Sequence, residues 1–197
     1  MFNVQCPIDH RSLVIGCWLL FFLCSCDPDY VPKPRGYFRI ELPEKNYSEF
    51  SPAGCPFSFE IPQYAEMIRD SNRLAEPCWW YVDFPQFHSQ IYISYKKVNN
   101  DLNKFIEDAH TLVYKHTVKA DAINEKRFSN GNNVHGVYYE LGGNAASQIQ
   151  FFATDSTSNF IRGALYFNAL PNNDSIAPVL KFLKKDIEHL ISTLQWK

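Results

Sequence analysis

Residues 134–168 read VHGVYYELGGNAASQIQFFATDSTSNFIRGALYFN, and this stretch contains three candidate strands in succession. In Val134–Leu141, apolar side chains recur at alternate positions, which predicts a strand with one buried face. The sequence Gly142-Gly143-Asn144 then predicts a turn, because glycine tolerates a positive φ. Ser147–Thr154 and Phe160–Asn168 follow at short spacing, so the whole stretch is expected to form an antiparallel meander.

Further strands are expected before this meander. Alternating apolar side chains or a high content of aromatic and β-branched residues identify them. The segments are Tyr37–Leu42, Pro56–Ile61, Trp79–Phe84, Ser89–Val98 and Ala122–Ser129. The polar connection at 63–77 is expected to be irregular, with at most a short helical turn.

Two segments have helical spacing instead. Leucine and other apolar residues recur every three or four positions from Asp101 to about Val118, with an N-cap at Asp101 or the preceding asparagine. A second helix is predicted from Ser175 to about Trp196, capped by Ser175 and with Pro178 tolerated in its first turn. Its apolar stripe is expected to be the largest single contribution to the core.

The order of these elements predicts the fold class. Strands arrive in runs, and there is no alternating βαβ order, so we expect an α+β fold with a mainly antiparallel sheet flanked by two long helices. A chain of 197 residues that is 46% hydrophobic can fill one core, which predicts a single globular domain over 37–197. The net charge of -2 gives no basic excess, so a nucleic-acid partner is not expected.

The N-terminus has the order of a secretory signal, with an apolar run that ends at Leu23. Leu23 lies three positions before Cys26, and small residues separate them, which is typical of a lipoprotein signal cut before an acylated cysteine. We therefore predict a signal peptide at 1–25, followed at 26–36 by the lipidated Cys26 and an extended, proline-rich stalk. The alternatives are a plain secreted protein and a transmembrane anchor, although the apolar run has about half the ~20 residues that spanning requires.

Two further cysteines, Cys55 and Cys78, remain in the body of the chain. An even pair in an exported protein predicts a disulfide. The alternative is two buried free thiols.

Residues with chemical potential are few. His110, His116 and Asp121 could be brought together as a metal or catalytic site, but hydrogen-bonded histidines at a polar edge are the simpler interpretation. Trp79 and Trp80 could form a binding surface. The alternative is that one packs in the core and the other covers the far face of the sheet. No phosphate-binding loop, nucleophile elbow or His-Glu-x-x-His motif is found, and no catalytic residue, metal or cofactor is predicted.

Several longer motifs resemble the gliding motility lipoprotein GldD family of Bacteroidota. They are YVPKPRGYFRI at 30–40, CPFSF at 55–59, CWW at 78–80, YKHTVKADAI at 114–123, GNAASQIQFF at 143–152 and RGALYF at 162–167. The resemblance implies an envelope protein needed for gliding motility and for type IX protein secretion, with other proteins of that machinery as partners. The element order is also similar to the PsbP-type α-β-α sandwich, an analogy at the level of fold.

Together, these observations predict a lipid-anchored, non-catalytic component that faces the periplasm and is held to a membrane by its N-terminal lipid. One alternative is a periplasmic module that binds a small ligand or the cell wall through an aromatic cleft near Trp79 and Trp80. A less favoured alternative is a hydrolase or metal enzyme that uses His110, His116 and Asp121.

Overall fold

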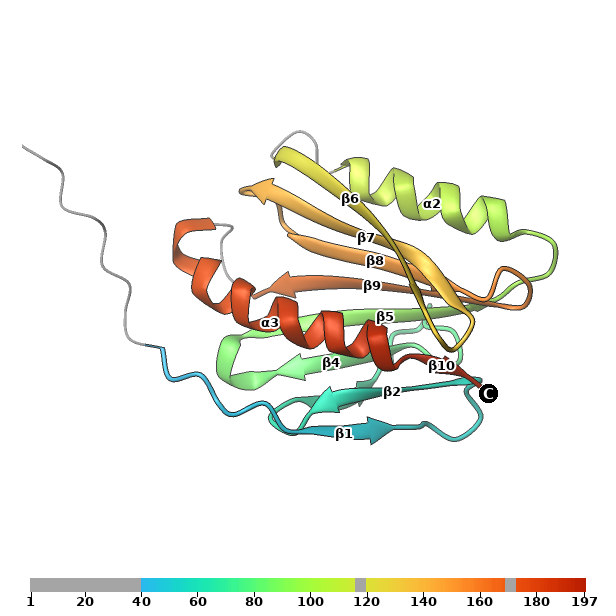
Figure 1. Cartoon of the computed structure of the whole chain (residues 1–197), viewed down its shortest axis with the longest axis horizontal. Helices are drawn as coiled ribbons and strands as arrows, with labels where there is room; N and C mark the ends of the chain where they lie inside the picture. Colours follow the sequence, from blue (N-terminus) through green and yellow to red (C-terminus); the bar gives the residue numbers. More distant parts are fainter. Residues whose placement is uncertain (1–39, 116–119, 169–172) are drawn as a thin grey trace, which may run out of the picture. The chain divides into compact units, whose positions relative to one another are not determined.

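The structure, a computed structural model, describes residues 40–115, 120–168 and 173–197. Within these ranges the chain is a mixed α+β fold with two antiparallel sheets and two α-helices (Figure 1). The predicted signal peptide at 1–25, Cys26 and the stalk at 26–36 lie outside the described residues.

The larger sheet has seven strands in the order β3-β4-β5-β9-β8-β7-β6, and all neighbouring strands are antiparallel. In chain order they are β3 (Glu66–Arg69), β4 (Trp80–Phe84), β5 (Ser89–Lys97), β6 (Ala120–Asn130), β7 (Val134–Gly143), β8 (Ile149–Thr154) and β9 (Asn159–Phe167). A short 3-10 helix, η1 (Pro85–Phe87), joins β4 to β5. The meander predicted over 134–168 is confirmed as β7, β8 and β9, and it places β9 at the centre of the sheet.

The smaller sheet consists of β1 (Tyr47–Phe50), β2 (Phe57–Pro62) and β10 (Gln195–Trp196). Its central strand, β2, pairs with β1 on one side and with the C-terminal β10 on the other. The two ends of the described chain therefore meet in one small sheet, which lies beside α3 (Asn173–Thr193) in Figure 1.

The side of the large sheet that faces α3 holds the main core. Leu183 and Ile187 of α3 are fully buried there, and so is Leu194, the residue directly after the helix. They belong to one cluster with β2 and with the inward side chains of β4, β5, β8 and β9. At roughly 1.5–3 kcal/mol for each buried aliphatic side chain, this stripe is a large gross contribution to folding before ordering entropy is subtracted.

The opposite side of the large sheet carries α2 (Leu102–Tyr114). Its buried Ala109 and Val113 pack on Tyr139, Phe152 and Phe160, which point away from the α3 side because side chains alternate along each strand. The sheet thus separates two apolar clusters, one with each helix.

Strands β7 and β8 approach closely at one glycine. A Cβ atom at Gly136 would lie 1.9 Å from the carbonyl oxygen of Phe152, a residue of β8 that pairs with Val137. Only a residue without a Cβ fits this position, so Gly136 is required by packing and not by its φ angle.

The connection between β8 and β9 is organised by Asp155. Its Oδ1 accepts hydrogen bonds from the backbone amides of Thr157, Ser158 and Asn159 at 2.8–2.9 Å, and its Oδ2 accepts one from the Asn159 side chain at 2.7 Å. Burial acts to raise the pKa of Asp155, but these donors outweigh it and lower the pKa to about 2. The ionised carboxylate therefore helps to hold the turn.

Several predicted boundaries are wrong. The strand expected at Tyr37–Leu42 is absent at residues 40–42, and the first strand is β1 at Tyr47–Phe50; residues 37–39 lie outside the described residues. The segment at 63–77, expected to be irregular, contains β3. Both missed strands are short and lie at the edge of a sheet, so they lack the apolar alternation of a buried strand.

The helices also differ from expectation. The predicted end of α2 at Val118 is not matched, because α2 ends at Tyr114 and has 13 residues. α3 has 21 residues and begins at Asn173, so Ser175 is not its cap and Pro178 lies inside the helix. The chain then leaves the helix before Trp196 to form β10.

Candidate functional site

One side of the large sheet is only partly covered. α2 packs on β8 and β9 there, whereas the neighbouring part formed by β4 and β5 carries the exposed side chain of Tyr92. Between α2 and this open part lies a groove of about 330 Å³. We call it the tyrosine groove and define it by Trp79, Tyr81, Tyr92, Lys96, Asp108 and Arg162. A second hollow shares Tyr92 and Arg162 with it and continues past Tyr166.

Three tyrosines form a ladder across adjacent strands. Tyr81 of β4 is paired in register with Tyr92 of β5, and their rings meet edge to face with centroids 4.6 Å apart. Tyr92 also meets Tyr166 of β9 edge to face at 5.1 Å. Such contacts contribute about 0.5–1.5 kcal/mol each beyond area burial, and they hold the rings as a fixed wall. Tyr92 is nevertheless 41% exposed, so this wall faces solvent.

Arg162 lies at the base of the groove on the central strand, β9. Its Nη2 donates a hydrogen bond of 2.6 Å to Oε1 of Gln150 on β8. Burial lowers the pKa of Arg162, and a hydrogen bond with the neighbouring Tyr166 hydroxyl offsets part of this shift. A guanidinium remains protonated at neutral pH, so a positive charge is held at the base of the groove.

Acidic side chains lie around the groove, and most have partners. Asp70 accepts a hydrogen bond of 2.9 Å from the Asn72 amide, and a hydrogen bond from Tyr81 is the main reason that the pKa of Asp70 is lowered. Asp83 accepts a hydrogen bond of 2.7 Å from Gln90 Nε2. Asp108 lies on the exposed side of α2. The groove therefore combines a half-buried cation with acidic groups at its rim.

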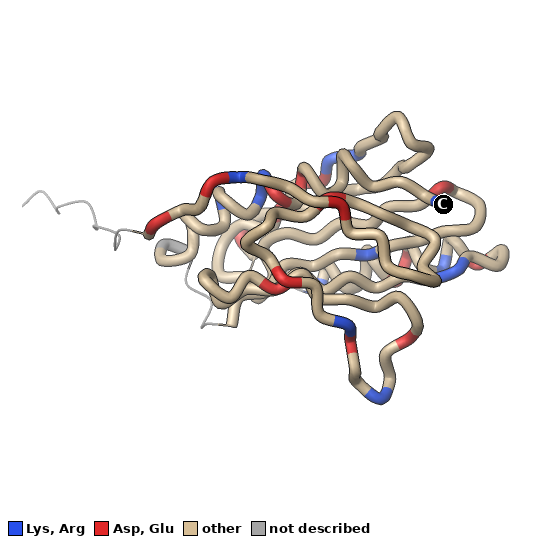
Figure 2. Tube along the Cα trace, turned by 90° about the horizontal axis from the view of Figure 1, so that it is seen from below, with Lys and Arg blue, Asp and Glu red and all other residues tan. Residues whose placement is uncertain are grey.

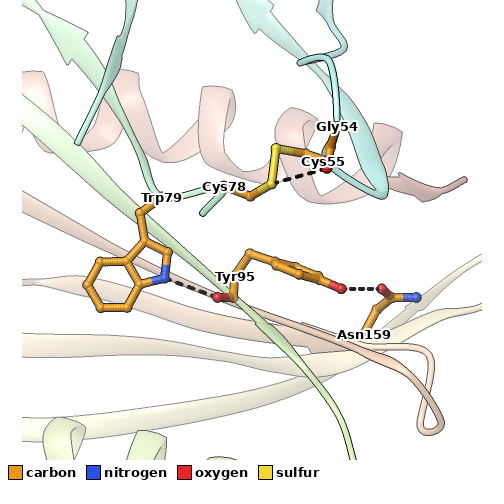
Figure 3. Close-up of a disulfide and its surroundings, with 6 residues drawn as sticks. All are labelled: Gly54, Cys55, Cys78, Trp79, Tyr95 and Asn159. Carbon is orange, nitrogen blue, oxygen red and sulfur yellow. Dashed lines mark hydrogen bonds between the residues drawn. A yellow bond between two sulfur atoms is a disulfide. The ribbon is translucent and has the colours of Figure 1, made fainter. Parts of the chain in front are cut away.

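A disulfide between Cys55 and Cys78 fixes one end of this region. Their Cα atoms are 5.7 Å apart, in agreement with the bond predicted from cysteine parity. The bond ties the loop before β2 to the residue before Trp79 (Figure 3). The Trp79 indole donates a hydrogen bond of 3.0 Å to the Tyr95 carbonyl oxygen, so the edge of the groove is anchored to β5.

Trp79 and Trp80, predicted as a possible binding surface, lie on opposite faces, which is the alternative that the sequence left open. Because neighbouring side chains in an extended segment point to opposite faces, the two indoles do not share a surface. Trp80 packs against the main core, with Phe50 edge to face at 5.1 Å, while Trp79 lines the tyrosine groove. Lys96 Nζ lies 5.4 Å from the centroid of the Trp79 ring, a cation–π geometry.

The structure tests only part of the hypothesis that His110, His116 and Asp121 form a metal or catalytic site. His110 is half-buried on α2, with a ring nitrogen 3.1 Å from the Tyr139 hydroxyl, and it belongs to the contacts of the α2 core. His116 lies outside the described residues. Among residues 40–115, 120–168 and 173–197, no group of three or more His, Cys, Asp and Glu side chains has the spacing of a metal site.

The sequence interpretation missed a buried polar cluster on the α3 side. Asp186 is 2% exposed, and its carboxylate accepts hydrogen bonds from Lys45 at 2.5 Å, Tyr47 at 2.8 Å and Tyr64 at 2.5 Å. Lys45 Nζ also lies 3.7 Å from the centroid of the Phe182 ring. Burial, followed by the hydrogen bond to Asp186, raises the pKa of both tyrosines, so the hydroxyl groups stay protonated and can donate. This cluster fastens the start of β1 and the loop after β2 to α3.

Charges of both signs are otherwise interspersed along the chain. Figure 2 marks these residues along the Cα trace, where positions with Lys or Arg alternate with positions with Asp or Glu. None of the helices that the structure describes is both long enough and apolar enough to span a membrane.

Comparison with known families gives one match over most of the chain. The sequence profile of the family described as gliding motility lipoprotein GldD matches residues 27–196. This span includes every strand and helix named above. Among curated proteins, none matches the chain significantly.

Among solved structures, the chain is similar to the solution structure of cyanobacterial PsbP from Synechocystis sp. PCC 6803. The two share 8% sequence identity with a TM-score of 0.47, and the alignment covers 79% of this chain and 95% of that chain. A likeness at this level carries over no function and no site residue.

Proposed function

This chain belongs to the gliding motility lipoprotein GldD family, and from that premise we propose that it is a lipid-anchored, non-catalytic accessory protein of gliding motility and type IX protein secretion. The observation that carries the proposal is the family match over residues 27–196, which leaves residues 1–26 and the final residue unmatched. Its expected partners are other envelope proteins of the same machinery.

The proposed location is the periplasmic side of a membrane, with Cys26 as the acylated anchor. The Cys55–Cys78 disulfide supports an oxidising compartment, because such bonds persist mainly in exported proteins. One acyl chain binds a membrane only marginally, so we expect two or more chains on Cys26. The change Cys26→Ser should then leave the protein as an uncleaved precursor or release it from the membrane.

The proposal that the protein acts by contact is supported by the setting of His110. Its ring lies against Tyr139, Tyr114 and Phe152, with centroids 5.5–6.4 Å apart, which is the environment of a packing residue. A residue in this role contributes to stability and needs no substrate.

The test is complementation of a strain that lacks this protein. We expect Cys26→Ser to abolish colony spreading and export of a type IX substrate, whereas His110→Ala and Asp121→Ala should restore both to the level of the unmodified chain. Immunoblots and lipid labelling provide the control for abundance and anchoring. An abundant, folded and lipidated Asp121→Ala protein without activity would contradict contact as the mechanism. A Cys26→Ser protein that still carries lipid would contradict the anchor.

Crosslinking of the intact lipoprotein in its own envelope tests the partner class. Capture of gliding or type IX secretion proteins supports the proposal. In the control, the envelope is solubilised and the protein is denatured before crosslinking. If the same proteins are still captured, the contact does not depend on a folded surface.

A further inference from the structure

The charge at the base of the tyrosine groove is not neutralised by a carboxylate of the described chain. Among the described residues, the ion pairs join Lys45 to Asp186, Lys96 to Glu76, Lys184 to Glu140 and His189 to Glu60, and none involves Arg162. A half-buried guanidinium without an acidic partner is unusual, because removal of an ion from water is costly unless another charge compensates.

Hydrogen-bond donors also exceed acceptors around Arg162. A guanidinium has five N–H donors, and the described acceptors are Gln150 Oε1 and the Tyr166 hydroxyl. Gln150 is 1% exposed, and its Nε2 is a buried donor without a partner. The site is therefore short of acceptor oxygen atoms and has a net positive centre.

We propose that the tyrosine groove binds a ligand through a single carboxylate group, which Arg162 holds, while an apolar or aromatic part of the ligand lies against Tyr92. This inference goes beyond the role in motility, and it holds whether or not that role is correct. The ligand is a small molecule or a chain end that presents one free carboxylate.

The rim of the groove favours a carboxylate over more highly charged anions. Asp70 and Asp108 line the same groove as Arg162, and Asp83 lines the adjoining hollow. A phosphate dianion or a dense anionic membrane surface would be repelled by these groups, whereas a monoanion can reach the base with a neutral remainder near the rim. Lys96 adds little net attraction, because it already pairs with Glu76.

The geometry of the groove fits such a ligand. The planar guanidinium can donate two parallel hydrogen bonds to a carboxylate, which adds orientation as well as strength. Tyr92 stands beside it, exposed on one side and supported on the other by Tyr81 and Tyr166, so a ring or apolar group can pack on it without rearrangement. The hydrogen bond that Arg162 Nη2 donates to Gln150 Oε1 fixes the guanidinium in place and leaves other N–H donors available for a ligand.

The probe is N-acetylphenylalanine, with its neutral amide and inorganic phosphate as comparisons. Binding to the full-length lipoprotein in detergent is followed by the amide NMR signals of residues 90–94 and 160–166. We expect saturable shifts with the carboxylate and at least tenfold weaker binding of the amide. Equal binding of carboxylate and amide would overturn the proposal, and so would stronger binding of phosphate.

Three variants locate the interaction. Arg162→Lys keeps the charge but loses the planar donor pair, so we expect at least tenfold weaker binding and a retained fold. Tyr92→Ala should weaken binding about fivefold, because an aromatic contact of this kind contributes about 0.5–1.5 kcal/mol. Lys181→Gln, an exposed cation on α3, is the matched control and should leave affinity unchanged. If Arg162→Lys and Tyr92→Ala both bind like the unmodified chain, the groove is not the site.

Discussion

The buried carboxylate of Asp186 gives the sharpest test of how the fold is held together. It accepts hydrogen bonds from Lys45 just before β1, from Tyr47 at the start of β1, and from Tyr64 just after β2. Asp186→Asn keeps the size of the side chain but removes its charge and one acceptor oxygen. The change therefore isolates the electrostatic role of the cluster, because it leaves no cavity.

The expected loss of stability is the cost of the broken interactions, reduced by their overlap and by the hydration that Lys45 recovers. Hydrogen bonds to a charged group contribute about 1.5–3 kcal/mol each, and loss of one partner of a buried ion pair costs about 3–5 kcal/mol. The hydrogen bonds share one carboxylate, so their contributions are not additive. The side chain of Lys45 is 24% exposed and can recover part of its hydration. We expect a loss of about 2–4 kcal/mol in the free energy of unfolding, with a decrease of about 5–15 °C in Tm.

Urea unfolding at pH 7, followed by circular dichroism, measures this loss. Glu107→Gln is the matched control: Glu107 is an exposed carboxylate on α2, and this change should alter stability by less than about 0.5 kcal/mol. Tyr64→Phe alone should cost about 1–2 kcal/mol, and the double variant should cost less than the sum of the two. A loss below 1 kcal/mol for Asp186→Asn, or strict additivity with Tyr64→Phe, would refute the reasoning.

Three further changes test other parts of the fold. Asp155→Asn should lower the free energy of unfolding by about 1 kcal/mol at pH 7, after allowance for solvent screening. Unfolding is measured at a series of pH values from 7 to 2. Because the pKa of Asp155 is lowered to about 2 in the folded state, this stabilisation is present above pH 4, and the gap to the variant should close as pH falls towards 2. Replacing Cys55 and Cys78 by serine should cost about 3 kcal/mol through the unfolded chain, whereas equal stability of the oxidised and reduced protein would contradict the bond. Gly136→Ala should cost more than 2 kcal/mol, because its Cβ would overlap the backbone of β8; a near-neutral melting curve would show that the strands can separate there.

The strands with clear alternation could be predicted from the sequence because their signal is local. Phe57, Phe59 and Ile61 point into the core as expected, and so do Ile91 and Ile93. The missed strands carry little local signal. β3 reads Glu-Met-Ile-Arg and lies at an edge, and β10 has only two residues. Such strands are formed by pairing with a neighbour that is already in place, which no short window of sequence reveals.

The polar clusters depended on contacts between distant segments. Asp186 lies three residues after Leu183 and four before Leu190, both buried, so helical spacing alone could have placed it inside the core stripe. Its partners could not be found in the same way, because Lys45, Tyr47 and Tyr64 are 141, 139 and 122 residues away. The composition of the tyrosine groove likewise required the strand order β4-β5-β9, which brings Tyr81, Tyr92 and Arg162 together.

The two sides of the large sheet are built for different purposes, and this difference explains why a binding groove can persist. On one side, α3 and the small sheet seal the main core, and both the disulfide and the Asp186 cluster fasten them there. On the other side, α2 covers only the strands beside its own apolar residues. An apolar surface left open beyond α2 would favour association, yet polar and charged side chains lie there beside the apolar ones, among them Tyr81, Tyr92 and Arg162. Such a surface can remain hydrated, but the charge of Arg162 is half-buried without an acidic partner among the described residues, which is unfavourable for stability.

If Arg162 served stability alone, an apolar residue of similar size at the base of the groove would pack against Phe160 and the tyrosine ladder without this desolvation penalty. Arg162→Met should therefore leave the fold at least as stable as the unmodified chain while it removes carboxylate binding, and a strongly destabilised Arg162→Met protein would show that the charge is structural.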